Sequence, residues 1–228
     1  MPRTKAKKSK SNASPPSALQ RPWEHVPRLV VFDLDFTLWY PEMYELDGAP
    51  FKKNKTTGVV TDRSGEEVHF FPAVHTVLSV LETDPQFKDT CEVAVASRTT
   101  EPQWAKTCMR LMDVDILSAA DIEAQRDAHK KSLQSIVDYE AIYPRNKRVH
   151  FAQIKEQSGI EYEDMLFFDN EYYNITDVGK MGVVCAYCPQ GLSEGSWIQG
   201  MEAFQEAKRK AASGEKRSAA LHADDGDY

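Results

Sequence analysis

The sequence has few of the features that mark a secreted or membrane-spanning protein. Four cysteines among 228 residues are too few to build a disulfide scaffold. No apolar run approaches the roughly 20 residues that a helix needs to cross a bilayer. No apolar segment follows the basic N-terminus, as it would in a secretory signal. We therefore expect reduced cysteines, no membrane partner and a cytoplasmic location.

Basic residues are scarce in the middle of the chain. The net charge is −7, but residues 29–205 carry 16 Lys or Arg against 29 Asp or Glu, a net charge of −13. Because general nucleic-acid binding rests on many Lys and Arg contacts to phosphate, we expect no nucleic-acid partner for this core. The 41% of hydrophobic residues supports a packed interior. The length favours one globular domain, over residues 28–205, and we expect a monomer.

The basic residues gather at the N-terminus instead. Residues 3–16 are rich in Lys, Ser and Pro and have almost no large apolar side chain. We expect residues 1–27 to form a disordered basic tail. A solvated tail, a nuclear-localisation signal at Lys5–Lys10 and an organelle transit peptide all stay open. Residues 206–228 are expected to form a flexible tail after their first turn or two.

The core alternates short apolar runs with amphipathic segments. This alternation favours a doubly wound, Rossmann-like α/β fold with a parallel sheet flanked by helices. The expected strands are residues 29–33, 93–96, 165–168 and 183–187. The expected helices are one near 74–81, one with Thr100 as N-cap and Gln103 closing a capping box, one from about 151 to Gly159 and a short one ending near Gly182.

Two stretches depart from the alternation. Residues 39–72 are rich in Pro, Gly and aromatic residues, and 59–61 and 67–70 flank a turn, which predicts a β-hairpin flap. Residues 113–140 carry many charges, and we expect helical excursions or loop there.

Carboxylates follow two of the expected strands. Asp33 and Asp35 end the first strand, and Asp169 ends the third. Because ligands bind beyond the carboxyl ends of strands in open α/β sheets, we expect these groups to converge. Their mutual repulsion is relieved by a hard cation such as Mg²⁺, which prefers oxygen ligands. The alternative is that Asp33 and Asp35 only cap the turn after the strand.

Candidate anion-binding groups follow the second strand and precede a later helix. Ser97 and Arg98 lie just before a predicted helix N-terminus, where free N–H groups favour an anion. A simple turn and N-cap is the alternative. Lys147 lies in the basic run Arg145–Arg148, which is typical of a solvated surface cluster.

Four ordered motifs carry a family resemblance. Val-Val-Phe-Asp-Leu-Asp-Phe-Thr-Leu-Trp ends at Trp39, Ala-Ser-Arg-Thr at Thr99, Tyr-Pro-Arg-Asn-Lys at Lys147 and Leu-Phe-Phe-Asp-Asn-Glu at Glu171. Together they resemble the haloacid dehalogenase (HAD) superfamily of phosphotransferases. The Trp39 ending and the short flap in the cap position resemble the eukaryotic magnesium-dependent phosphatase-1 family. The likeness runs from about Leu29 to about Phe204.

The resemblance implies a Mg²⁺-dependent phosphoric monoester hydrolase, with an aspartyl-phosphate intermediate. Asp33 would be the nucleophile and a metal ligand. Asp35 would be the general acid and base, with its main-chain carbonyl as a second metal contact. The implied substrates are protein phosphotyrosine, which would make it a protein-tyrosine phosphatase, and sugar phosphates.

The resemblance also assigns the phosphate and metal contacts. Ser97 and Lys147 would hold phosphoryl oxygens, and Arg98 would clamp the substrate. Asp169 would be a metal ligand, and Asn170 would supply an oxygen ligand or a hydrogen bond beside it. The family commonly has two acids at this last motif, so Asn170 is a departure that removes one negative charge.

Two other functions stay open. Asn170 and the long stretch 113–140 are compatible with a catalytically weakened HAD-fold binding or scaffold protein. The basic N-terminal arm is compatible with a phosphatase for nuclear phosphoproteins or nucleic-acid ends. Cys185 and Cys188 supply two of about four ligands that structural zinc needs, so we expect buried thiols there, and we expect His150 at the surface.

Overall fold

A parallel β-sheet lies at the centre of the computed structural model, which describes residue 19 and residues 21–214. Its strands are β1 (Leu29–Phe32), β6 (Glu92–Ser97), β9 (Tyr139–Ile142), β10 (Met165–Asp169) and β11 (Val184–Tyr187). Their order is β11-β10-β1-β6-β9, and every neighbouring pair is parallel. The predicted doubly wound α/β fold is confirmed, and the first strand occupies the middle of the sheet.

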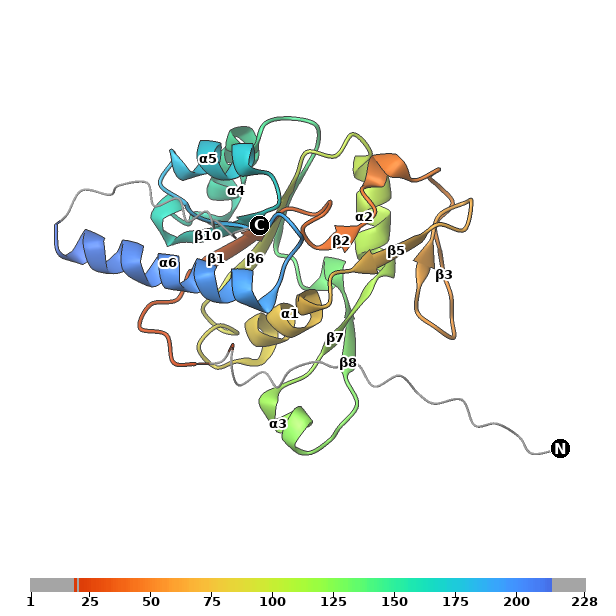
Figure 1. Ribbon diagram of the computed structural model, residues 1–228, viewed down its shortest axis with the longest axis horizontal. Coiled ribbons are helices and arrows are strands. Elements are labelled where there is room, and N and C mark those ends of the chain that lie inside the picture. The colour runs from red at the N-terminus through yellow and green to blue at the C-terminus, as the bar shows by residue number, and fades with distance from the viewer. Residues whose placement is uncertain (1–18, 20, 215–228) are drawn as a thin grey trace, which may run out of the picture.

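Helices cover both faces of this sheet (Figure 1). On one face are α1 (Ala73–Thr83), α2 (Pro102–Leu111) and α6 (Glu194–Ala212), and on the other are α4 (Lys147–Ser158) and α5 (Tyr172–Gly179). Each of these five helices is longer than one turn. Their apolar faces pack on the sheet and complete the two halves of the core.

Strand β1 shows why both faces need covering. Val30 and Phe32 belong to the core beneath α1 and α6, whereas Leu29 and Val31 belong to the core beneath α4 and α5. All four side chains have no exposed surface. A run without polar alternation is typical of a strand buried on both faces, which is how the sequence predicted it.

The start of the folded region differs from the predicted boundary. Leu19 is 1% exposed and Trp23 packs against the core, so the last part of the expected disordered tail 1–27 is ordered. Helix α6 ends at Ala212, within the turn or two after residue 206 that the prediction allowed before the C-terminal tail. The basic cluster Lys5–Lys10 lies outside the described residues.

The predicted flap is a small antiparallel sheet. Strands β2 (Trp39–Tyr40), β5 (Glu67–Phe70), β4 (Val60–Thr61) and β3 (Lys52–Lys53) pair in the order β2-β5-β4-β3. The β4–β5 pairing is the predicted hairpin, which is confirmed. The flap lies beside α2, to the right of the main sheet in Figure 1.

The prediction for residues 113–140 is wrong in its main point. Strands β7 (Asp113–Ile116) and β8 (His129–Ser132) pair as an antiparallel arm, with the short helix α3 (Ala119–Glu123) between them. The last residues of the stretch begin β9, a fifth strand of the main sheet that we did not predict. The arm projects from the body below α1 (Figure 1).

The start of α2 also differs from the prediction. Glu101, not Thr100, is the N-cap, and its side chain makes no capping hydrogen bond. Thr99 Oγ1 accepts the Glu101 amide instead, at 3.2 Å. In contrast, α4 ends at Gly159 as predicted, since its φ of 67° is the left-handed conformation that favours glycine.

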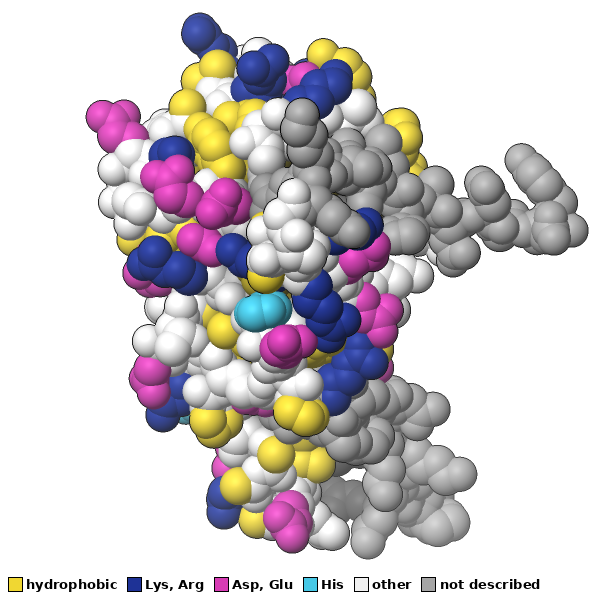
Figure 2. Space-filling view, turned by 90° about the vertical axis from the view of Figure 1, so that its left-hand side faces the viewer, with side chains coloured by type: hydrophobic (Ala, Val, Ile, Leu, Met, Phe, Trp, Pro, Cys, Tyr) yellow, Lys and Arg dark blue, Asp and Glu magenta, His cyan; other side chains and the backbone are white. Residues whose placement is uncertain are grey.

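The face at the left of Figure 1 carries charges of both signs. Figure 2 shows Lys and Arg side chains interleaved with Asp and Glu side chains there. Ion pairs on this side include Lys208 with Asp164 and Arg209 with Glu24. Among the described residues, no helix combines the length and apolarity needed to cross a bilayer.

One carboxylate organises the turn of the flap. Asp62 is 3% exposed. Its Oδ1 accepts the amides of Ser64, Gly65 and Glu66 at 2.8–3.0 Å, and its Oδ2 accepts the Asp47 amide at 2.7 Å. Burial raises the pKa of Asp62, but these hydrogen bonds outweigh burial and lower the pKa to about 2.

We expect Asp62→Ala to destabilise the flap. Losing the acceptor leaves several amides without partners, a cost of about 1–3 kcal/mol. The depressed pKa means that the wild-type advantage is present above pH ~4 and is lost as the pH falls toward about 2. Amide hydrogen exchange should show faster exchange at Ser64 and Glu66, with Asp89→Ala as an exposed control. Unchanged exchange at these amides at neutral pH would contradict the prediction.

Candidate active site

The carboxyl edge of the sheet brings residues from three motifs together. Phe32 pairs with Phe168 in the parallel register. Asp33 and Asp169 are the next residues along the two strands, so they lie side by side at the same edge of the sheet. Asp33 N donates to Phe168 O at 3.0 Å, which fixes the chain at this point. Asp33 is 7% exposed and Asp169 is fully buried.

Lys147 joins the two carboxylates. It is the first residue of α4, whose start is fixed because Asn146 Oδ1 accepts the Val149 amide at 3.1 Å. Lys147 is 1% exposed. Its Nζ lies 2.5 Å from Asp33 Oδ1 and 3.1 Å from Asp169 Oδ2, and it donates to a main-chain carbonyl of β6. The alternative of a solvated surface cluster is therefore wrong for Lys147.

The charged groups at this edge shift one another's pKa. Burial raises the pKa of Asp33, and the neighbouring Asp169 charge adds to the rise, while Lys147 opposes it. Burial alone would lower the pKa of Lys147, but the two carboxylates outweigh it and raise that pKa. The ammonium therefore stays charged and balances one carboxylate. When Asp33 and Asp169 are both ionised, as a nucleophile requires, one negative charge is left for a further cation to balance.

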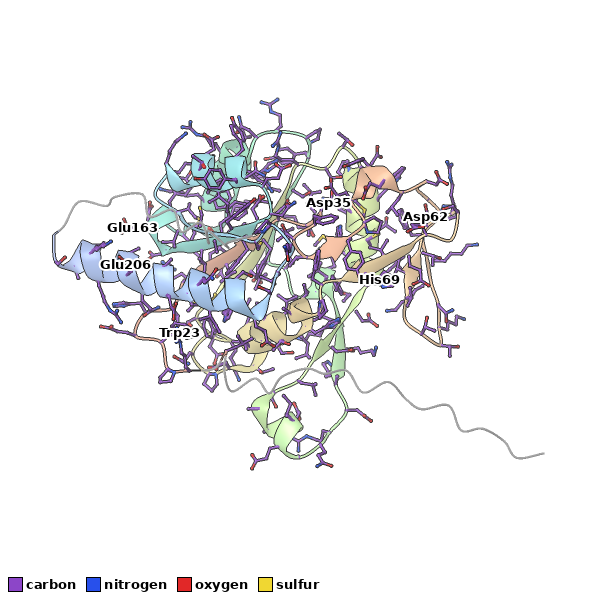
Figure 3. The ribbon with its side chains drawn as sticks, in the orientation of Figure 1. Trp23, Asp35, Asp62, His69, Glu163 and Glu206 are labelled. Atoms are coloured by element: carbon purple, nitrogen blue, oxygen red, sulfur yellow. The ribbon has the colours of Figure 1, made fainter. Side chains whose placement is uncertain are left out.

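Asp35 is held by the flap. Its Oδ1 accepts the indole N–H of Trp39 at 2.8 Å and the amide of Met43 at 3.2 Å. Burial raises the pKa of Asp35, although these bonds oppose the rise. A raised pKa keeps more of the carboxyl protonated, which is the form that a general acid needs. Figure 3 shows Asp35 where the main sheet meets the flap.

The second motif places one buried hydroxyl and one exposed cation. Ser97 ends β6 and is 1% exposed, and its Oγ accepts the Thr99 amide at 3.3 Å. Arg98 is half-exposed, and its Nη1 lies 3.4 Å from Glu171 Oε2 and 3.3 Å from Asn174 Oδ1. Ser97 and Arg98, like Lys147, thus lie at the carboxyl edge, but the Arg98 side chain is oriented toward the last motif.

Asn174 is a site residue that the sequence reasoning missed. It is 3% exposed, and its Nδ2 donates to both oxygens of Asp169, at 3.2 and 3.0 Å, and to Glu171 Oε2 at 3.0 Å. Asn174 therefore links the Asp169 carboxylate to Arg98. Its position five residues after Asp169, on the inner face of a short helix, was the available signal.

Asn170 is bound to the first motif. Its amide donates to Thr37 Oγ1 at 3.1 Å, and its Oδ1 lies 3.4 Å from the same hydroxyl. Thr37 is fully buried. This contact ties the loop after β10 to the loop after β1, and it leaves the Asn170 side chain beside the two carboxylate-bearing strands.

The donor set of this edge suits a small hard cation. Within residues 19 and 21–214, no three His, Cys, Asp or Glu side chains are grouped as a ready-made metal site. Mg²⁺, however, usually uses one or two carboxylates and keeps several waters. Asp33 and Asp169 supply two carboxyl groups, which when both ionised carry one negative charge more than Lys147 balances, and the Asp35 carboxyl group faces Trp39. The residues present therefore fit Mg²⁺ with few protein ligands.

Two smaller expectations have different outcomes. His150 is fully buried, so the expectation of a surface histidine is wrong. Its Nε2 lies 2.9 Å from Tyr143 O, and burial lowers its pKa to about 4, so the ring stays neutral. Cys188 is 2% exposed and Cys185 is partly buried, and both are free thiols.

Comparisons with known proteins show the family to which the chain belongs. Residues 25–207 match the family described as Acid Phosphatase. The chain is 34% identical to human Magnesium-dependent phosphatase 1 over 183 residues, which are 80% of this chain and 90% of that protein. It is 35% identical to a HAD-like hydrolase superfamily protein of Schizosaccharomyces pombe over 158 residues, 69% of this chain and 83% of that one.

One solved structure is more remote. The N-terminal part of a Bacteroides fragilis protein, which contains a phosphatase domain complexed with Mg, is 15% identical with a TM-score of 0.46 over 82% of this chain and 42% of that chain. The two sequence relatives, in contrast, match 80% and 69% of this chain at 34% and 35% identity. The chain therefore belongs to the acid phosphatase family, and its predicted relationship to the magnesium-dependent phosphatase-1 proteins of the HAD superfamily is confirmed.

Proposed function

We propose that this chain is a Mg²⁺-dependent phosphomonoester hydrolase that acts through an aspartyl-phosphate, on protein phosphotyrosine or on sugar phosphates. The observation that carries the proposal is the buried ammonium of Lys147 between the carboxylates of Asp33 and Asp169. A buried cation beside one carboxylate nucleophile is suited to phosphoryl transfer, where positioning and charge supply most of the catalysis.

In the first step an Asp33 oxygen forms a bond to phosphorus while the bond to the ester oxygen breaks. Asp35 gives its proton to the departing oxygen, and the hydrogen bond from Trp39 orients its carboxyl group. Lys147 and Ser97 hold the phosphoryl oxygens, and Arg98 binds the substrate from the rim. The products of this step are the free alcohol and phospho-Asp33.

In the second step Asp35, now ionised, removes a proton from water as the water oxygen attacks phosphorus. The bond to Asp33 breaks, so inorganic phosphate leaves and both carboxyl groups return to their first states. When bound, Mg²⁺ supplies charge that offsets the phosphate and the two carboxylates. Asp33, Asp169, Asn170 and the main-chain carbonyl of Asp35 are the groups that would hold it.

Metal removal tests the proposal directly. We expect the full-length chain to hydrolyse p-nitrophenyl phosphate with Mg²⁺, and a chelator to remove at least about nine-tenths of the activity. Added Mg²⁺ should restore it. Ca²⁺ should restore little, because it takes more ligands at longer distances than Mg²⁺. Phosphate release from phosphotyrosine peptides and sugar phosphates then separates the two substrate classes.

The same assay decides between this function and its alternatives. Failure to hydrolyse any phosphomonoester with Mg²⁺ would contradict the proposal and favour a binding or scaffold protein. Deleting residues 1–20 tests the nuclear alternative. An unchanged location and substrate preference after this deletion would remove that alternative.

A further inference from the structure

Glu42 is an acidic residue of the flap that the proposed mechanism does not use, and the Asp35 carboxyl group fixes its main chain. Asp35 Oδ1 accepts the amide of Met43 at 3.2 Å. That amide belongs to the peptide unit that begins at Glu42, so the Cα atom of Glu42 lies within about 6 Å of the Asp35 oxygen. Glu42 N also donates to Glu45 Oε2 at 3.0 Å, which holds the turn in place. Glu42 is therefore fixed beside the proposed general acid.

The Glu42 side chain lies near the carboxyl edge of the main sheet. It is half-buried. Burial raises the pKa of Glu42, and the charges of Asp35, Glu45 and Glu171 add to the rise, while Tyr44 opposes it. Carboxylates affect one another in this way only at short range, because water and salt screen their charges. Asp35 follows β1 and Glu171 follows β10, so the Glu42 carboxylate is close to the loops after two neighbouring strands.

The cations of the site do not balance this carboxylate. Lys147 is held between two buried carboxyl groups, and Arg98 Nη1 lies 3.4 Å from Glu171 Oε2. None of the ion pairs formed by residues 19 and 21–214 includes Glu42. Glu42 thus places an uncompensated negative charge beside the general acid, on the path that a leaving group must take.

We propose that Glu42 selects the charge of the leaving group, so that the site takes phosphate esters with a neutral or cationic leaving group and rejects those with an anionic one. The proposal rests on the proposed function, in which Asp35 protonates the leaving oxygen. The group attached to that oxygen must then lie beside Asp35, and so near Glu42. A negative charge there is repelled by the Glu42 carboxylate, and an ammonium group is attracted.

This selection acts within both proposed substrate classes. An amino group on a sugar phosphate, or a lysine beside phosphotyrosine in a peptide, brings a cation to the leaving group. A carboxylate on the sugar, or a glutamate beside phosphotyrosine, brings an anion. Charge complementarity of this kind decides between similar ligands more than it adds to their common affinity.

Three alkyl phosphates isolate the effect of charge. Phosphoethanolamine, propyl phosphate and phosphoglycolate have leaving groups of similar length that end in an ammonium, a methyl and a carboxylate group. They are compared in kcat/KM with the full-length chain and Mg²⁺ at neutral pH. We expect Glu42→Gln to lower the value for phosphoethanolamine and to raise it for phosphoglycolate, each about threefold, and to leave propyl phosphate unchanged.

Salt gives a second measurement of the same effect. Because dissolved ions screen exposed charges, the phosphoethanolamine-to-phosphoglycolate ratio of the wild type should fall as salt is added. The ratio of Glu42→Gln should depend less on salt. A role of Glu42 in the structure of the flap alone would not produce this difference.

Glu66→Gln is the matched control. It removes an exposed carboxylate from the turn between β4 and β5, where Glu66 N donates to Asp62. Figure 3 shows Asp62 at the end of the flap away from Asp35. The control should keep the wild-type ratio. Because each ratio compares substrates of one variant, a general loss of activity cancels, and the different acidities of the three alcohols affect every variant equally.

Two further pairs of substrates identify the source of the charge. One pair is glucosamine phosphate and glucose phosphate, both esterified at the primary alcohol. The other is a phosphotyrosine peptide with either lysine or glutamate beside the tyrosine. The pair whose ratio falls further in Glu42→Gln identifies the substrate class in which Glu42 selects.

The outcomes separate this inference from the function on which it rests. If the wild type hydrolyses the alkyl phosphates and Glu42→Gln leaves the phosphoethanolamine-to-phosphoglycolate ratio unchanged, Glu42 does not select charge and the proposed function stands. If the wild type with Mg²⁺ hydrolyses none of the three esters, the proposed function is wrong, and the inference with it.

Discussion

Replacing Asp33 with asparagine is expected to lower phosphatase activity by roughly three orders of magnitude or more, since the amide cannot form the phosphoryl bond. Asparagine is close to aspartate in size, and its Oδ1 can still accept the Lys147 N–H at the place where Asp33 Oδ1 lies 2.5 Å from Nζ. The melting temperature should therefore stay within a few degrees of the wild-type value. Phosphate release and thermal unfolding are the two measurements.

A matched substitution controls for the change from acid to amide. Asp89→Asn alters an exposed carboxylate near the amino end of β6, at the opposite edge of the sheet from Asp33. It should leave both activity and melting temperature unchanged. If Asp33→Asn keeps more than a tenth of the wild-type activity, Asp33 is not the nucleophile.

The convergence of Asp33 and Asp169 could be predicted from the sequence because it follows from two simple features. Both residues end apolar runs that are buried on both faces, and parallel strands present their carboxyl ends at one edge. Once Phe32 pairs with Phe168, the two carboxylates are neighbours without any further choice of side-chain conformation.

The position of Lys147 could not be predicted in the same way. Arg145 and Arg148 on either side of it are exposed, so the run has the composition of a solvated cluster. The burial of Lys147 depends on where helix α4 begins, and the cap at Asn146 sets that point. One turn later, His150 is buried for the same reason. The residue at which helix α4 begins thus decides whether Lys147 and His150 are buried or exposed, which the composition of the run does not show.

The arm and the fifth strand were missed because their side chains are only partly buried. In β7, Val114 and Ile116 are buried while Asp113 and Asp115 are half-buried, which is the alternation of a strand with one covered face. The partner strand β8 has no buried residue, and β9 lies at the edge of the sheet. Edge strands carry weaker apolar patterns than central ones. The many charged residues of 113–140 therefore pointed to helical excursions or loop instead of strands.

Replacing Lys147 with methionine is expected to abolish activity and to destabilise the fold. Methionine keeps an unbranched side chain, but the carboxylates of Asp33 and Asp169 lose the cation that lies 2.5 and 3.1 Å from them. Removing one partner from a buried ion pair costs about 3–5 kcal/mol. In a protein of this size, that is a fall in melting temperature of about 10 °C. Lys155→Met removes a partly exposed lysine from the same helix and should change the melting temperature little.

Two experiments test whether Lys147→Met loses stability through uncompensated negative charge rather than through a cavity. The double variant Asp33→Asn with Lys147→Met removes one carboxylate charge, so it should recover part of the lost stability while staying inactive. The stability difference between it and the two single variants gives the coupling energy of the Lys147–Asp33 pair. Added Mg²⁺ should also raise the melting temperature of Lys147→Met more than that of the wild type, because the cation replaces the missing ammonium beside both carboxylates. If Lys147→Met is as stable as the wild type, or if the double variant is less stable than Lys147→Met alone, the buried ammonium does not balance these carboxylates and the charge argument for the site fails.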